Sequence, residues 1–198
     1  HKDAPARLYS GAGDGVMAAR RGYAESDDAG VTWRRISEGL RHHYLWSVAV
    51  NPGDPETVVV SAASGPWQGH DPRVAESTIY RKIAGEPWRE VREGLPPVEG
   101  RLVTVLAANQ DEPGVFYALT NEGLYRSSDA GSSWERLEIG QQDHYGRPTG
   151  LAVIGNPTAV ERFMTSVGLS HAASTQLASV FSTAAVSAQA GSGVAANA

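Results

Sequence analysis

Histidine, arginine, carboxylate and aromatic residues gather in four polar segments that separate apolar runs of the chain. The segments supply, in chain order, Arg41, His42, His43 and Tyr44; Trp67, His70, Asp71, Arg73 and Glu76; Pro96, Pro97, Glu99 and Arg101; and Gln141, Asp143, His144, Tyr145 and Arg147. Aromatic rings stack on the flat faces of sugars, whereas Arg and His supply directional hydrogen-bond donors. These residue types together predict a site for a polar ligand, either a glycan or a peptide segment.

The candidates for ligand binding are the imidazole, guanidinium and aromatic side chains of these segments. They are His42, His43, Tyr44, Trp67, His70, Arg73, His144, Tyr145 and Arg147. The alternative interpretation is that the segments are polar only because they are loops in contact with water.

Catalysis is a second alternative, and it would depend on carboxylates. A glycosidase needs two of them, about 5 to 5.5 Å apart for retention or about 6.5 to 9.5 Å apart for inversion. The carboxylates that we nominate are Asp71, Glu99 and Asp143. No motif singles out one pair among them, so hydrolysis stays the alternative to binding.

Metal and cofactor sites find little support in the sequence. Three imidazoles and a water could hold zinc, and His42, His70 and His144 could supply them. Their spacing matches no known ligand signature, and the chain has no cysteine. The glycine string at residues 11–15 is not followed by a helical pattern, so it does not predict a nucleotide site. We therefore assign no metal and no cofactor.

Three repeated segments must position these side chains. They run from Tyr23 to Leu40, from Tyr80 to Leu95 and from Tyr125 to Gly140. Their tryptophans, Trp33, Trp88 and Trp134, are 55 and then 46 residues apart, which is the period expected of propeller blades. Between the repeats, β-branched runs alternate with turn residues at 46–64 and 102–120 and predict paired strands.

The sequence thus predicts an all-β fold, a β-propeller of four-stranded blades. Three blades are recognisable, and a fourth begins near residue 150 and is incomplete. We assign residues 1–164 to the blades and residues 165–198 to an uncharged tail rich in Ala and Ser, or to a degenerate last blade. Trp46 opens an apolar strand, and we expect it in the core or in a contact between blades.

Two of the repeats carry the full pattern S-x-D-x-G-x-[ST]-W. Its residues are Ser26, Asp28, Gly30, Thr32 and Trp33 in the first repeat and Ser127, Asp129, Gly131, Ser133 and Trp134 in the third. The pattern suits a tight hairpin, because the carboxylate accepts backbone N–H bonds and the glycine permits a positive φ. The Trp ring can then pack between neighbouring sheets. The middle repeat keeps Gly85 and Trp88 but has Lys82, Ile83 and Pro87 near the other positions, which predicts a different turn.

These motif residues resemble the Asp-box, or BNR, repeats of sialidases, sortilin-type receptors, xyloglucanases and a photosystem II assembly factor, all of which are β-propellers. In that superfamily the box lies on the turn between the third and fourth strands of a blade, away from the binding face. The resemblance therefore implies that Asp28 and Asp129 are structural. If the boxes mark one face, strand alternation places the loops between blades, and those between second and third strands, on the opposite face.

Sialidases of this superfamily also carry a Phe/Tyr-Arg-Ile-Pro motif, an arginine triad and a Tyr/Glu nucleophile pair. The nearest string here, residues 80–83, lacks the proline and lies where the repeat predicts a strand. The sequence therefore favours a non-catalytic binding or assembly module that presents its loop face to a glycan or protein. The alternative is a sialidase-like or xyloglucanase-like glycoside hydrolase, or a fragment of one.

The composition of the chain disfavours some classes of partner. The formal net charge of the 198 residues is −5, which disfavours nucleic acid as a partner. Because no run of about 18 apolar residues occurs, we expect no membrane insertion. At the observed spacing the chain supplies at most about four blades, whereas closed propellers use about four to eight. We therefore expect either a fragment of a larger propeller or self-association that completes one.

Overall fold

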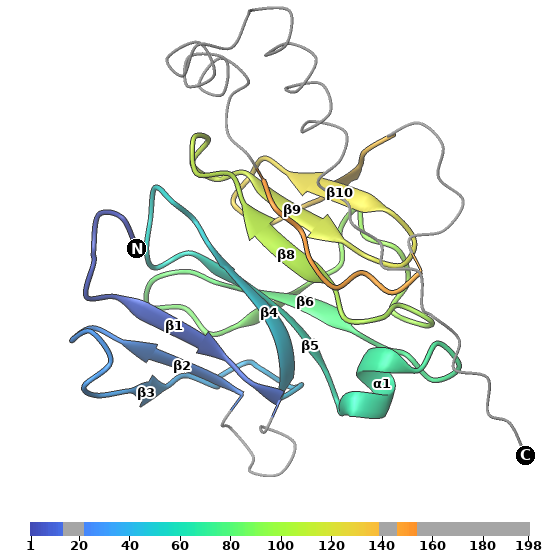
Figure 1. Cartoon of the computed structure of the whole chain (residues 1–198), viewed down its shortest axis with the longest axis horizontal. Helices are drawn as coiled ribbons and strands as arrows, with labels where there is room; N and C mark the ends of the chain where they lie inside the picture. The colour runs from blue at the N-terminus through green and yellow to red at the C-terminus, as the bar shows by residue number, and fades with distance from the viewer. Residues whose placement is uncertain (14–21, 139–145, 154–198) are drawn as a thin grey trace, which may run out of the picture.

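Three antiparallel sheets make up the part of the chain that a computed structural model describes, residues 1–13, 22–138 and 146–153 (Figure 1). The first sheet contains β1 (Leu8–Gly11), β2 (Tyr23–Ser26) and β3 (Arg34–Arg35). The second contains β4 (Tyr44–Val50), β5 (Val58–Ala63), β6 (Thr78–Lys82) and β7 (Arg89–Val91). The third contains β8 (Val105–Ala108), β9 (Phe116–Leu119), β10 (Leu124–Ser127) and β11 (Glu135–Arg136).

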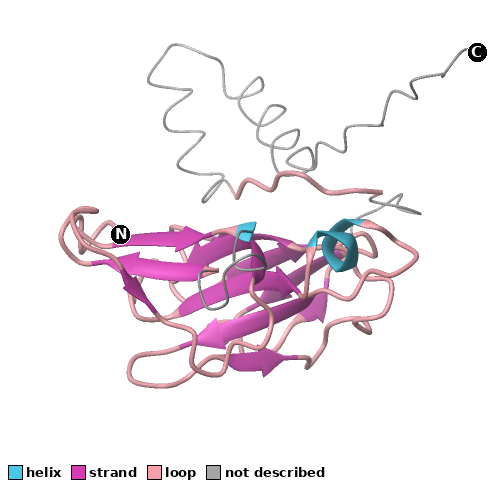
Figure 2. Cartoon of the chain, turned by 90° about the horizontal axis from the view of Figure 1, so that it is seen from below, coloured by secondary structure: helices cyan, strands magenta, loops and turns pink. Residues whose placement is uncertain are grey.

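Each sheet is a meander in which strands that follow one another in the chain are paired. Strands dominate in Figure 2, and the single-turn helix α1 (Pro66–His70) lies at the ends of the strands. Within the described ranges, no helix is long and apolar enough to cross a membrane. The structure confirms the all-β prediction of successive blade-like sheets. The proposed tail, residues 165–198, lies outside the described residues.

The sheets lie side by side in chain order and are held together by apolar cores between them (Figure 1). The middle sheet is covered on both faces, so all six residues of β5 are buried. Because successive side chains point to opposite faces, Val58 and Val60 pack toward the first sheet while Val59 packs toward the third. Leu151, in the expected fourth unit, packs against the third sheet beside Val105 and Leu119.

Two of the repeat tryptophans, Trp88 and Trp134, each pack their sheet against the one before it. Trp88 is 2% exposed; its backbone N–H donates to the Glu38 carbonyl at 2.8 Å, and its indole N–H donates to the Ile36 carbonyl at 2.9 Å. The approach requires glycine, because a Cβ on Gly39, at φ +80°, would lie 2.1 Å from the Trp88 carbonyl oxygen. The contact recurs between the second and third sheets, where the Trp134 N–H donates to the Glu93 carbonyl at 3.0 Å.

The exposure of Trp46 differs from the prediction made from the sequence. We expected it in the core or between blades, but its side chain is 45% exposed. The strand pairing of β4 with β5 shifts between Leu45 and Ser47, and this β-bulge changes the alternation at Trp46. The tryptophan therefore belongs to the surface at this end of the sheet.

Candidate functional site

Strand order places the polar segments at one end of the sheets. One end of the sheets carries the turns from β2 to β3, β4 to β5, β6 to β7, β8 to β9 and β10 to β11. The connections from β3 to β4, from β5 to β6 and from β7 to β8 lie at the opposite end, because paired strands alternate in direction. These connections contain several of the candidate residues, namely His42, His43, His70, Asp71, Arg73 and Glu99. Gln141, Asp143, His144 and Tyr145 lie outside the described residues.

An aromatic patch forms at this end from Tyr44, Trp46, Trp67 and His70. The His70 ring lies 4.4 Å from the Trp46 ring and 5.7 Å from the Tyr44 ring, edge to face in both cases. The Tyr44 hydroxyl and His70 Nε2 are 2.9 Å apart and share a hydrogen bond. Trp67 is 71% exposed and, three residues before His70 in α1, is its neighbour on the helix surface. The patch therefore presents two indoles to solvent around a fixed imidazole.

The position of α1 depends on close backbone packing. A Cβ on Gly69 would lie 3.1 Å from both Tyr44 Cε1 and Val103 Cγ1. The Val103 N–H donates to the Gly69 carbonyl at 2.9 Å, and the Glu76 N–H donates to the Gln68 carbonyl at 2.9 Å. The helix is thus tied to the connection between β7 and β8, which holds the aromatic patch in place.

Charged groups border the patch. Arg73 Nε and Nη2 donate to the two oxygens of Asp71 at 3.0 and 2.6 Å, and this pairing lowers the pKa of Asp71 to about 2. Burial lowers the pKa of His70, and the positive charge of Arg147 lowers it further. At neutral pH, therefore, the carboxylate of Asp71 is ionised and the His70 imidazole is uncharged.

A second polar cluster lies around Glu90. The Tyr80 hydroxyl and His42 Nδ1 are 2.8 Å apart, and the pKa of His42 is lowered mainly by burial. The Glu90 carboxylate accepts hydrogen bonds from Arg92 at 2.7 Å and from Arg41. Burial would raise the pKa of Glu90, but these two arginines lower it overall. His42 and His70 thus belong to separate tyrosine pairs.

The structure gives the catalytic candidates little support as an acid and base pair. A general acid needs a raised pKa, whereas that of Asp71 is lowered. Glu99 takes part in an isolated antiparallel bridge with Glu76, next to a backbone bond of 2.8 Å from the Gly100 N–H to the Ala75 carbonyl. Asp143 lies outside the described residues. Within those residues, no three His, Asp or Glu side chains gather as a metal would require.

Arg101 differs from the other polar residues of its segment. It is fully buried, and its guanidinium donates to the carbonyls of Ser77 and Pro96, both at 2.9 Å. Burial lowers its pKa to about 10. Arg101 therefore braces the connection between β7 and β8 and is not available to a ligand at the surface.

The two motif turns, at the opposite end of the sheets, contain matching hydrogen-bond networks. In the first, Asp28 accepts bonds from the Thr32 N–H at 2.8 Å and the Thr32 hydroxyl at 2.6 Å, while Ser26 Oγ accepts the Gly30 N–H at 2.8 Å. In the third sheet, Asp129 accepts the equivalent bonds from Ser133, at 2.9 and 2.7 Å. Both carboxylates are occupied by bonds within their own turns.

These turns predict an acid-sensitive contribution to stability. The bonds from Thr32 lower the pKa of Asp28 to about 2, below an ordinary value of about 3.9. A lowered folded-state pKa stabilises the protein above the unfolded pKa, and this contribution is lost as the pH falls toward 2. We expect the melting temperature of Asp28→Asn to fall less between pH 4 and pH 2 than that of the wild type. Equal slopes in the variant, the wild type and an Asp3→Asn control would contradict this.

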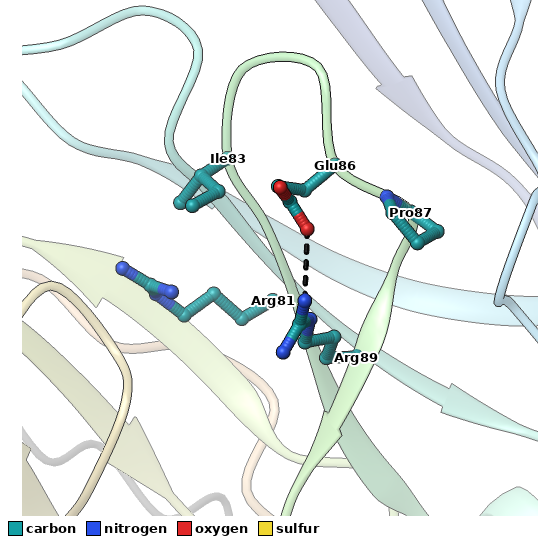
Figure 3. Close-up of a pocket in the computed structure, with 5 residues that line it drawn as sticks. All are labelled: Arg81, Ile83, Glu86, Pro87 and Arg89. Carbon is teal, nitrogen blue, oxygen red and sulfur yellow. Dashed lines mark hydrogen bonds and ion pairs between the residues drawn. The ribbon is translucent and has the colours of Figure 1, made fainter.

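The middle turn is one residue shorter than the other two and has Lys82 where they have serine. Beside it lies a shallow depression of about 230 Å³ lined by Arg81, Ile83, Glu86, Pro87 and Arg89 (Figure 3). Glu86 and Arg89 pair across it at 2.8 Å, and Arg81 Nε donates to the Ala130 carbonyl of the third-sheet turn at 2.7 Å. Its charged groups are thus engaged within the protein, at the end away from the aromatic patch.

Comparison with known proteins gives a fold but no family. No protein-family model and no curated protein matches the chain. Among solved structures, a glycoside hydrolase family 74 xyloglucanase from Xanthomonas campestris is similar over 69% of this chain and 19% of its own, with a TM-score of 0.51 and 19% identity. An ancestral family 74 enzyme is similar over 68% of this chain and 17% of its own, with a TM-score of 0.48 and 16% identity.

The YCF48 protein, in a structure with a D1 peptide, is similar over 58% of this chain and 32% of its own, with a TM-score of 0.40 and 20% identity. This chain spans less than a fifth of the length of the two hydrolases. The similarity to the xyloglucanase supports an arrangement of propeller blades for the three sheets.

Proposed function

We propose that this chain is a non-catalytic propeller module that binds a glycan on the aromatic patch. The observation that carries the proposal is the pair of solvent-exposed indoles near His70: Trp46 contacts the His70 ring, and Trp67 lies three residues before His70 in α1. Indole rings of this kind stack on sugar rings, and neighbouring polar groups then select hydroxyl groups. The neutral His70 ring and the guanidinium of Arg73 are suitable polar neighbours.

One further point supports a binding role over hydrolysis. Asp71 is held ionised by Arg73, which suits a group that accepts hydrogen bonds better than one that donates a proton. Because a structure that shares the blade arrangement is a xyloglucanase, soluble β-glucan oligosaccharides, xyloglucan fragments among them, are the first ligands to test.

The test is calorimetric titration of the full chain with these oligosaccharides. Trp46→Ala and Trp67→Ala should each weaken binding by at least about 10-fold, because truncating an aromatic anchor in a binding site costs about 2 kcal/mol or more. Trp33→Ala removes an exposed indole from the first-sheet turn, remote from the patch in the strand order, and should leave affinity unchanged.

The other outcomes separate the alternatives. Release of new reducing ends, lost in Asp71→Asn, would favour the hydrolase. Binding of a protein but of no glycan in the panel would replace the ligand class in the proposal. Binding that survives both Trp46→Ala and Trp67→Ala would move the site away from the patch.

A further inference from the structure

Among the residues that the structure describes, no sheet packs on one face of the first sheet. Trp33 occupies the same place in its repeat as Trp88 and Trp134, yet it is 44% exposed while they are 2% and 5% exposed. Leu8 and Val31 are exposed as well, and a Cβ on Gly30 would lie 3.4 Å from the Leu8 side chain and 3.8 Å from the Trp33 ring. We call Leu8, Val31 and Trp33 the first-sheet face. In the other two sheets, the equivalent tryptophan packs against the preceding sheet.

The three sheets form a row in chain order, and the third sheet, at the opposite end from the first, carries a surface that matches the first-sheet face. Arg81 of the second sheet donates to the Ala130 carbonyl in the next turn at 2.7 Å. Arg126 is the counterpart of Arg81, because each pairs across its hairpin with the residue that follows the repeat tryptophan. Arg126 lies 3.6 and 3.9 Å from two glutamates, beyond normal hydrogen-bond length. Its equivalence to Arg81 places it where a guanidinium can donate to a further turn.

The first-sheet turn is the counterpart of the third-sheet turn that Arg81 binds. Ala29 and Ala130 each lie three residues after the motif serine and have φ values of 58° and 60°. Their N–H groups donate to Ala6 and Gly114, both at 2.9 Å. The chain thus has a first turn that could accept an arginine and a third sheet that carries one, at opposite ends of the row.

We propose that two copies of this chain associate head to tail, so that the first-sheet face of each packs against the third sheet of the other. In this interface Arg126 donates to the Ala29 carbonyl of the second copy, as Arg81 does to Ala130 within the chain. A second copy is the occupant because one chain carries both halves of the interface. Two copies of the three described sheets make six blades, which is within the range of closed propellers, and head-to-tail contacts form a closed ring when the rotation between copies closes.

The strand count agrees with this arrangement. The first sheet has three strands and its β1 edge is at the end of the strand order, whereas the other sheets have four. In the two four-stranded sheets, the first strands, β4 and β8, contact each other. Residues 150–153 extend this series of neighbouring first strands, because Leu151 packs against Val105 of β8. In the head-to-tail pair, residues 150–153 would lie beside β1 of the second copy, where the described part of the chain places no fourth strand.

The test is the solution mass of the full chain by size-exclusion chromatography with light scattering. We expect twice the chain mass of 21.0 kDa. Trp33→Glu should weaken association at least about 30-fold and yield a monomer, because it buries a charge in place of an interface indole. Trp67→Glu changes an exposed tryptophan outside the interface and should leave the pair intact.

Arg126→Glu is the second variant, and it decides the matter if Trp33→Glu fails to fold by circular dichroism. We expect it to dissociate the pair, whereas Arg89→Glu, at an exposed arginine paired with Glu86, should not. A wild-type monomer at every protein concentration overturns the proposal. A pair that survives both Trp33→Glu and Arg126→Glu also overturns it. Glycan binding by the monomeric variants is expected, because the aromatic patch lies within one copy.

Discussion

Replacing Trp88 with alanine should lower the free energy of unfolding by about 3 to 5 kcal/mol, the cost typical of truncating a large buried aromatic. The Trp88 ring packs edge to face on Tyr23, with ring centroids 4.8 Å apart, in the core between the first and second sheets. The substitution also leaves the Ile36 carbonyl, which is only partly buried, without its indole donor, so this lost bond adds a smaller cost. Guanidinium denaturation monitored by circular dichroism would measure the loss.

Trp33→Ala is the matched control, since it removes the same side chain from the same place in the first repeat. Its ring is 44% exposed and packs on no preceding sheet among the described residues. We therefore expect a loss below about 1 kcal/mol, measured at a protein concentration low enough to keep the chain monomeric. Equal losses in the two variants would show that the contact between sheets contributes little to the stability that Trp88 provides.

The repeats made the fold predictable. Trp33, Trp88 and Trp134 hold the same place in successive sheets, and at Trp88 and Trp134 this place makes the same contact with the preceding sheet, so one structural unit appears several times in the sequence. The turn residues between them, such as the cluster at 51–55, marked the ends of paired strands, and β4 and β5 do meet there. A repeated contact is visible without any knowledge of the partner, because each copy confirms the others.

The candidate site was less predictable because its properties arise from single, unrepeated contacts. The bulge that exposes Trp46 depends on the register of β4 against β5, which residue types alone do not specify. Asp71 resembled a catalytic carboxylate until its pairing with Arg73 was known. Arg101 stood among loop residues in the sequence, yet the fold buries it against backbone carbonyls. Side-chain pairing and burial of this kind become visible only in the three-dimensional structure.

For Lys82, the sequence predicted the departure from the motif but not the ion pair that Lys82 makes. The sequence identified it as a departure from the motif, and the structure reveals its partner, because Lys82 Nζ lies 3.0 Å from the fully buried carboxylate of Glu25 in the first sheet. Glu25 also accepts bonds from Arg7 at 2.7 Å and from the Tyr23 hydroxyl at 2.8 Å. The serine hydroxyl of the motif is thus replaced here by an ion pair that crosses from one sheet to the next.

Glu25→Ala should therefore destabilise the protein by about 3 to 5 kcal/mol, as expected when one member of a buried ion pair is removed. The variant leaves Lys82 nearly buried with Glu56, 3.9 Å away, as its remaining carboxylate. Arg7 keeps its pairings with Asp27 and, at 2.8 Å, with Glu56. Most of the penalty should therefore arise at Lys82, and it should appear as a lower denaturation midpoint.

That assignment can be tested by a double-mutant cycle. If the buried ammonium of Lys82 is the main cost, Lys82→Met in the Glu25→Ala background should recover at least about 1 kcal/mol, because it removes the uncompensated charge and retains apolar bulk. Lys82→Met alone should be destabilising, since Glu25 then faces Arg7 with one cation fewer. Additive losses in the double variant would contradict the coupling and would place the cost of Glu25→Ala in the Arg7 and Tyr23 contacts instead.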